Sequence, residues 1–332
     1  MQTARPIVVY GATGHTGRFV LRELLRRGLP AVAVGRRLAS DGLPPVAQRQ
    51  AALDDPEALQ RALAGCAAVI NCAGPFLDTA RPLVEAALRA GCHYLDVTAE
   101  QLSAQAVLDE FDAPARAAGI AVVPAAGFYG GLADLLASAL LAGDGAAADL
   151  RVGVALSHWW PTTGTRVTGV RNQAPRLVME GGRLVPLAQP AQTATWPFDE
   201  PFGAQPMVEL PFSEVVTMAR HLPLRSLHSF IGARALQDIR DPATPAPTAV
   251  DEQGRSAQRF AMEVIADGPR PRRAWATGQD IYAVSAPMVV EAALRLGSAG
   301  AGHRGALVLG QLGDARGFLG ALAPRHLAFG ID

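Results

Sequence analysis

Residues 7–28 read IVVYGATGHTGRFVLRELLRRG, an apolar run followed by three glycines and a helical pattern. The run at 7–10 is typical of a buried strand, and the apolar positions between 19 and 25 have helical spacing. A glycine-rich turn between a strand and a helix lets a pyrophosphate contact backbone N–H groups at the positive end of the helix. A tight turn without a ligand is the alternative. We predict a dinucleotide-binding turn at Gly11, Thr13, Gly14, His15, Thr16 and Gly17.

Strand-like and helix-like segments alternate after this turn. Short apolar strands are expected at 30–37, 46–53, 67–74, 93–98 and 120–125, with helices at 18–27, 55–65, 80–91 and 108–119. Such alternation is typical of an α/β fold with a doubly wound parallel sheet. Residues 1–148 are therefore predicted to form a Rossmann-type NADP-binding domain.

The rest of the chain has another pattern. Strands are expected at 150–156, 225–232 and 257–268, and residues 272–286 are expected to continue as a hairpin partner. Few helices lie among them, so residues 149–285 are predicted to form a second, α+β domain for substrate binding or dimerisation. Residues 286–332 are expected to return and pack on the first domain.

Composition excludes several classes of function. The chain has 332 residues, 49% of them hydrophobic, and a formal net charge of zero, which favours two domains and argues against nucleic-acid partners. It contains no lysine, so Schiff-base catalysis and a Walker-type lysine are excluded. Pro124 and Asp134 interrupt the long apolar stretch 117–143, so no membrane insertion is expected.

The cysteines and histidines carry no recognisable metal or disulfide pattern. Cys66, Cys72 and Cys92 form no CxxC pair, which is typical of free thiols in a reducing cytosol, and we expect a cytoplasmic protein. The seven histidines have no metal-ligand spacing, so no metal is expected.

Three further segments concern the cofactor. Arg36 and Arg37 end the second strand, where an NAD site usually has an acidic residue, and arginine suits a 2′-phosphate; NADP(H) is therefore predicted, with a solvated arginine pair as the alternative. Asp54 is expected either at the adenine edge or as a helix N-cap. The nicotinamide half is expected to pass the loop after the fourth strand, at Cys72, Ala73, Gly74 and Pro75.

Candidate catalytic residues follow two later strands. Asp96 and Glu100 lie at the carboxyl end of one strand, and Tyr129 follows the next, where its phenol could protonate or orient a substrate. A structural role is the alternative for each. Trp159 and Trp160 could line an apolar pocket, or belong to the domain core or a dimer interface; we expect a homodimer.

Four motifs in this order resemble the saccharopine dehydrogenase-like NADP-binding family: GATGHTGR, INCAGPF, PLVEAALRAGCHYLDVTAE and GIAVVPAAGF. The likeness is closer to its bacterial oxidoreductases and trans-acting enoyl reductases than to lysine-pathway saccharopine dehydrogenase. Such enoyl reductases carry Asp-Ser-x-Pro after Gly-Phe, whereas this chain has Tyr129-Gly130-Gly131 there. Short-chain dehydrogenases also begin with GATG, but their Tyr-x-x-x-Lys pair cannot exist in a chain without lysine.

The resemblance implies an NADP(H)-dependent oxidoreductase. We expect it to reduce a C=C or C=N bond of a small or acyl-type substrate. The alternatives are an amino-acid-type C–N dehydrogenase and a non-enzymatic NADP-binding sensor or scaffold.

Overall fold

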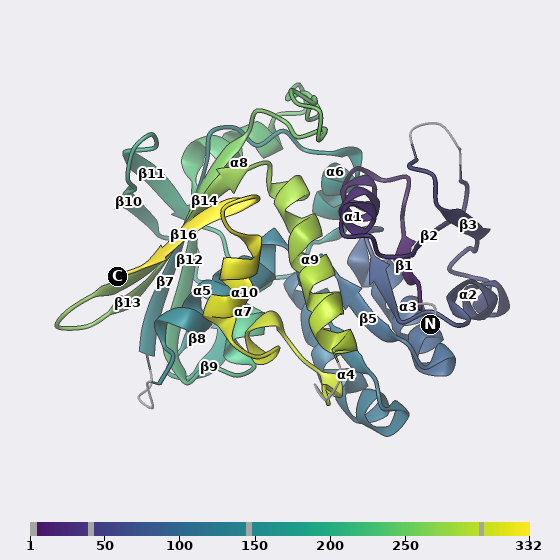
Figure 1. Cartoon of the computed structure of the whole chain (residues 1–332). Helices are drawn as coiled ribbons and strands as arrows, with labels where there is room; N and C mark the ends of the chain where they lie inside the picture. The colour runs from purple at the N-terminus through teal and green to yellow at the C-terminus, as the bar shows by residue number, and fades with distance from the viewer. Residues whose placement is uncertain (1–4, 39–42, 144–147, 299–301) are drawn as a thin grey trace.

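The structure is a computed structural model that describes residues 5–38, 43–143, 148–298 and 302–332. It contains two β-sheets, with the long helix α9 (Ile281–Gly297) between them (Figure 1). The carboxyl terminus lies at the edge of the second sheet (Figure 1).

The first sheet has seven strands in the order β15-β6-β5-β4-β1-β2-β3, and every pairing is parallel. Its strands are β1 (Ile7–Tyr10), β2 (Ala31–Gly35), β3 (Ala47–Gln50), β4 (Ala68–Asn71), β5 (His93–Asp96), β6 (Ala121–Val123) and β15 (Gly305–Ala306). The reversal of strand order at β1 and β4 is the topological switch point of a Rossmann-type fold, where ligands bind. The predicted doubly wound parallel sheet is confirmed.

Successive side chains along each strand point to opposite faces of this sheet, and they pack into two separate cores. The connecting helices are α1 (His15–Arg26), α2 (Pro56–Leu63), α3 (Phe76–Ala90) and α4 (Gln101–Ala118). Val8 and Tyr10 of β1 pack on one face with three of the helices that connect the strands, α2, α3 and α4, whereas Ile7 and Val9 pack on the other face with α1 and α9. Because both faces are covered, the inner strands are apolar, whereas the edge strand β3 has the sequence AQRQ and is largely exposed.

The second sheet has nine strands, seven of them in the order β10-β11-β12-β7-β13-β14-β16, with β8 on β12 and β9 on β8. All its pairings are antiparallel except β12 with β7. The strands are β7 (Ala148–Leu156), β8 (Leu177–Glu180), β9 (Arg183–Pro186), β10 (Thr193–Pro197), β11 (Ala204–Glu209), β12 (Leu224–Gly232), β13 (Arg259–Asp267), β14 (Arg272–Gln279) and β16 (Leu327–Ile331).

Short helices accompany this sheet. The turn η1 (Phe128–Leu132) leads from the first sheet into α5 (Ala133–Leu140), which packs on β13 and β14. The other elements are α6 (Thr163–Arg171), α7 (Glu214–Ala219), α8 (Ala233–Arg240), η2 (Leu309–Gln311) and α10 (Ala315–Leu322). Within the described residues, no helix is both long enough and apolar enough to cross a bilayer.

The carboxyl-terminal part differs from the expectation in two ways. The hairpin partner expected at 272–286 ends at Gln279, because the buried Asp280 accepts hydrogen bonds from Tyr282 N and Ala283 N and so starts α9. The segment 286–332 also serves both sheets. Helix α9 packs against α1 and β15 joins the first sheet, but β16 extends the second sheet along β14.

Candidate functional site

The glycine turn leaves the amino end of α1 open. Gly14 is the N-cap of the helix, and no side chain caps the first turn. A Cβ on Gly17 would lie 2.3 Å from Gly11 O, and Gly11 itself has a φ of +77°, so these two glycines are required by the turn. A Cβ on Gly14 would approach only Gly11 O, at 3.0 Å. Gly14 therefore keeps the surface above the free amides bare, as a bound pyrophosphate requires.

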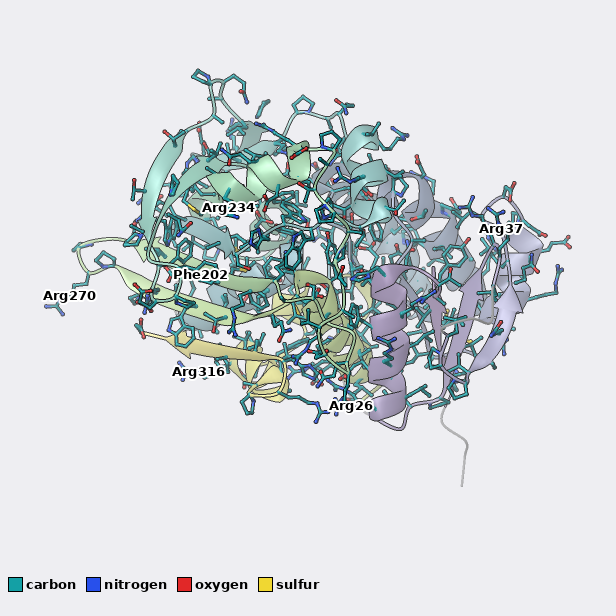
Figure 2. The ribbon with its side chains drawn as sticks, turned by 90° about the horizontal axis from the view of Figure 1, so that it is seen from above. Arg26, Arg37, Phe202, Arg234, Arg270 and Arg316 are labelled. Carbon is teal, nitrogen blue, oxygen red and sulfur yellow. The ribbon has the colours of Figure 1, made fainter. Side chains whose placement is uncertain are left out.

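The expected adenosine end lies after β2. Arg36 and Arg37 are both exposed, and Arg37 lies at the edge of the molecule away from the second sheet (Figure 2). Burial raises the pKa of Tyr10, an effect that Arg36 opposes and Asp54 strengthens, so both charges act near this phenol. Asp55, not Asp54, caps α2 by accepting from Ala58 N at 2.9 Å. The N-cap alternative for Asp54 is therefore wrong.

The loop after β4 brings the two domains together. Asn71 Oδ1 accepts from Ala73 N at 3.0 Å, and a Cβ on Gly74 would lie 2.8 Å from Thr168 Oγ1 of α6. Burial raises the pKa of the Cys72 thiol, and the nearby Asp96 carboxyl raises it further. The Cys72 thiol is therefore protonated at neutral pH, which argues against a role as a nucleophile.

A cavity of about 210 Å³ opens beside this loop, between the carboxyl ends of the first-sheet strands and the second domain. One wall comes from Thr16, Cys72, Gly74 and Glu100, and the opposite wall comes from α6 and the start of α9. Aromatic rings make up much of the remaining surface: Phe76, Phe128, Tyr129, Trp159, Phe212 and Tyr282. The cavity thus reaches both the predicted cofactor loops and the second domain, and it can hold an apolar molecule.

Tyr129 is one of the residues that line this cavity. Its ring packs against Phe212 at 4.3 Å and Trp159 at 5.6 Å between ring centroids. Its hydroxyl is buried and has no hydrogen-bond partner among the described residues. Burial raises the pKa of this phenol well above its usual value, so the group carries its proton at neutral pH. Tyr129 therefore brings a protonated phenol without a hydrogen-bond partner to the lining of the cavity.

The carboxylate oxygens of Asp96 and Glu100 already accept hydrogen bonds from the protein itself. Asp96 is fully buried, accepts from Tyr94 Oη, Thr98 N and Ala125 N, and is not among the residues that line the cavity. Burial raises the pKa of Asp96 to about 6. Glu100 lines the cavity, but its two oxygens accept from the first amides of α3, Phe76 N at 2.7 Å and Leu77 N at 3.0 Å. Both carboxylates therefore have structural partners, and these bonds favour the structural role that was considered as the alternative to a catalytic one.

The Gly130–Gly131 step has a steric explanation. Gly130 has a φ of +91°, and a Cβ there would lie 2.7 Å from the Ala125 Cβ. A Cβ on Gly131 would lie 2.7 Å from Leu309 Cδ1. Both glycines therefore serve a tight, buried turn, which orients Tyr129 toward the cavity.

Sequence reasoning missed Arg176 and the role of Tyr282. Arg176 follows α6, lies over Phe212 at 4.7 Å, and donates to Pro211 O at 2.6 Å. It supplies a guanidinium to the cavity lining. Tyr282 Oη bonds to Thr165 Oγ1 at 2.9 Å and accepts from Trp159 Nε1 at 3.1 Å, so it joins α9 to the second domain. Neither residue has a local sequence signal, because each reaches the cavity only through the fold.

The tryptophan pair divides its roles. Trp159 is buried and lines the cavity, whereas Trp160 stacks on His158 at 5.2 Å. Of the roles expected for the two tryptophans, lining an apolar pocket therefore applies to Trp159. Among the described residues, no group of histidine, cysteine or acidic side chains could hold a metal ion.

The parallel sheet, the uncapped glycine turn and the adjoining cavity define a dinucleotide-binding protein of the Rossmann type. Residues 7–123 match the family model described as saccharopine dehydrogenase NADP binding domain. The matched residues run from β1 to β6 of the first sheet.

Two relatives with curated names each match 37% of the chain. A saccharopine dehydrogenase-like oxidoreductase of Arabidopsis thaliana is 30% identical over 142 residues, 37% of this chain and 31% of that protein. A trans-acting enoyl reductase of Mycobacterium ulcerans is 30% identical over 133 residues, 37% of this chain and 32% of that protein. The chain thus spans about a third of the length of these relatives.

The whole chain also has a structural counterpart. Apo saccharopine dehydrogenase (L-Glu forming) of Saccharomyces cerevisiae superposes with a TM-score of 0.67 over 99% of this chain and 100% of that one. The two sequences are 12% identical, so the likeness shows a shared fold.

Proposed function

We propose that this protein is an NADP(H)-dependent oxidoreductase that reduces a C=C or C=N bond of a small or acyl-type substrate. The observation that carries the proposal is Tyr129, whose buried hydroxyl has no partner among the described residues, in the lining of a cavity that also includes Thr16, Cys72 and Gly74. The names of the relatives support the oxidoreductase class.

The residues of the first domain fit NADP(H). The open amides of α1 and the bare Gly14 would hold the pyrophosphate, and Arg36 would bind the 2′-phosphate. The bound cofactor would supply a hydride. The chain itself would provide an apolar cavity that excludes water and a phenol that gives a proton to the reduced substrate. Asp96 and Glu100 would act indirectly, by holding the loops that shape the cavity.

Arg176 favours the second candidate, an amino-acid-type C–N dehydrogenase. A guanidinium in the cavity lining could bind the carboxylate of such a substrate. An acyl substrate would use the aromatic walls instead.

One experiment separates these candidates. NADPH oxidation is followed spectrophotometrically with enoyl, imine and keto substrates, each with and without a free carboxylate. Arg176→Gln should raise KM by about tenfold or more only for carboxylate substrates. Arg234→Gln, an exposed arginine on α8 (Figure 2), is the matched control. If NADPH binds but no class is turned over, the sensor or scaffold role replaces the enzyme.

A further inference from the structure

A second cavity, of about 240 Å³, lies further along α1 and α9. It shares no lining residue with the cavity of Tyr129. Its apolar floor is formed by Phe19 and by the first turns of α9, from Ala283 to Pro287. Its rim comes from α1, from the loop at 253–255 and from residues 325–326 before β16. The cavity is therefore a separate compartment, built where both domains and the carboxyl-terminal segment meet.

The charges around this cavity are strongly one-sided. Four of the lining residues are arginines, and one lining residue, Glu23, is acidic. The arginines are Arg22, Arg26, Arg255 and Arg325. Glu23 already accepts from Arg26 and Arg27 at 2.7 Å each. The chain as a whole has no net charge, so this concentration of guanidinium groups is local.

Several of these guanidinium groups keep hydrogen-bonding capacity. Arg325 makes no hydrogen bond or ion pair within the described part of the chain. Arg22 donates one hydrogen bond to Gln253 O at 3.1 Å, and Arg255 donates from Nε to Asp251 Oδ2 at 2.8 Å. A guanidinium has five N–H donors, so each arginine retains donors for an oxyanion.

A histidine at the cavity has an unused polar atom. The side chain of His326 is 13% exposed, and its Nε2 is buried without a hydrogen-bond partner among the described residues. Its nearest acidic atom, Glu23 Oε1, is 3.8 Å away. Burial lowers the pKa of His326 to about 4, and Arg26, Arg325 and Arg27 oppose its protonation while Glu23 favours it. The imidazole is therefore neutral at neutral pH, and its N–H can be donated to an oxyanion.

We propose that this cavity binds a small organic anion, through Arg22, Arg255 and Arg325 at the rim and His326 inside. Carboxylate and phosphate oxygens share the geometry that guanidinium groups recognise, and the apolar floor accepts a short carbon skeleton. The cavity is too small for a second dinucleotide. A bound anion would connect α1, whose other end forms the cofactor turn, to the 253–255 loop and the chain end.

Calorimetry on the full chain, with NADPH saturating so that the cofactor site is filled, tests this proposal. The probes are citrate and inorganic phosphate in a chloride-poor buffer. We expect binding with Kd in the millimolar range or tighter. Arg325→Gln should weaken it by about tenfold or more, because this residue has no structural partner to lose. Tighter binding of citrate would identify a carboxylate ligand, and tighter binding of phosphate would identify a phosphate ester.

Two further variants guard the interpretation. Arg270→Gln makes the same chemical change at the tip of the β13–β14 hairpin, far from the cavity (Figure 2), and should leave anion binding unchanged. Gly254→Ala would place a Cβ 2.5 Å from Arg22 Nη1 and should displace that guanidinium. The proposal is overturned if neither probe binds, or if Arg270→Gln weakens binding as much as Arg325→Gln does. NADPH affinity, measured separately, should stay the same in every variant.

Discussion

Replacing Tyr129 with phenylalanine should separate catalysis from stability. The variant keeps the ring, and with it the contacts to Phe212 and Trp159, and loses only the hydroxyl. A buried hydroxyl without a partner costs roughly 1–3 kcal/mol. Its removal should therefore leave the free energy of unfolding unchanged or raise it by about 1 kcal/mol.

The catalytic effect should have the opposite sign. If the phenol delivers the proton, kcat should fall on the order of a hundredfold, which corresponds to about 2.7 kcal/mol of activation free energy. KM and NADPH affinity should change little, because the ring still lines the cavity. The assay compares steady-state NADPH oxidation with urea unfolding of the same protein.

Tyr94→Phe is the matched control for this variant. Tyr94 is also buried, but its hydroxyl donates to Asp96 Oδ2 at 2.8 Å and accepts from Asn71 Nδ2 at 3.2 Å. Its loss should destabilise the fold by about 1–3 kcal/mol. The reasoning fails if Tyr129→Phe destabilises the protein as much as Tyr94→Phe does, or if Tyr129→Phe turns over substrate at the wild-type rate.

Three further predictions concern the glycine turn, the choice of cofactor and the assembly. Gly14→Val should abolish NADPH binding with little change in melting temperature. Gly17→Ala should instead disrupt the turn itself, because its Cβ would lie 2.3 Å from Gly11 O. If the Gly14→Val variant binds NADPH normally, the loop is only a turn and does not bind the cofactor. The wild type should bind NADPH at least about tenfold more tightly than NADH, a gap of about 1.4 kcal/mol, and Arg36→Asp should remove most of it; equal affinities by calorimetry would contradict the role of Arg36. We also expect a homodimer at tens of micromolar; a monomeric mass by light scattering would show this expectation to be wrong.

The sequence was most informative where structure is local. The glycine turn, the strand-helix alternation and the helix ends at Gly91 and Gly119 follow from patterns a few residues long, and β1 to β6 of the first sheet were predicted, whereas β15 was not. The end of β14 was harder to predict. Asp280 stops the strand with a positive φ of 60°, which the apolar residues after it do not reveal.

The cavity was less predictable because its parts come from distant segments. Asp96 and Glu100 stand where catalytic groups stand in such folds, yet only the structure shows that their oxygens accept from backbone amides and, for Asp96 Oδ2, from the Tyr94 hydroxyl. Arg176 was missed for the same reason. Its guanidinium reaches Phe212, more than thirty residues away in sequence, only after the second sheet has formed.

The carboxyl-terminal segment has a consequence for how this protein can be divided. Because β15 completes one sheet and β16 extends the other, a single terminal stretch closes both halves of the molecule. A fragment that stops before α9 would leave the apolar face of α1 uncovered, including Phe19 and Leu24. The two halves are therefore poor candidates for separate expression. Chimeras between relatives should exchange the second domain together with the carboxyl-terminal segment that connects it to the first.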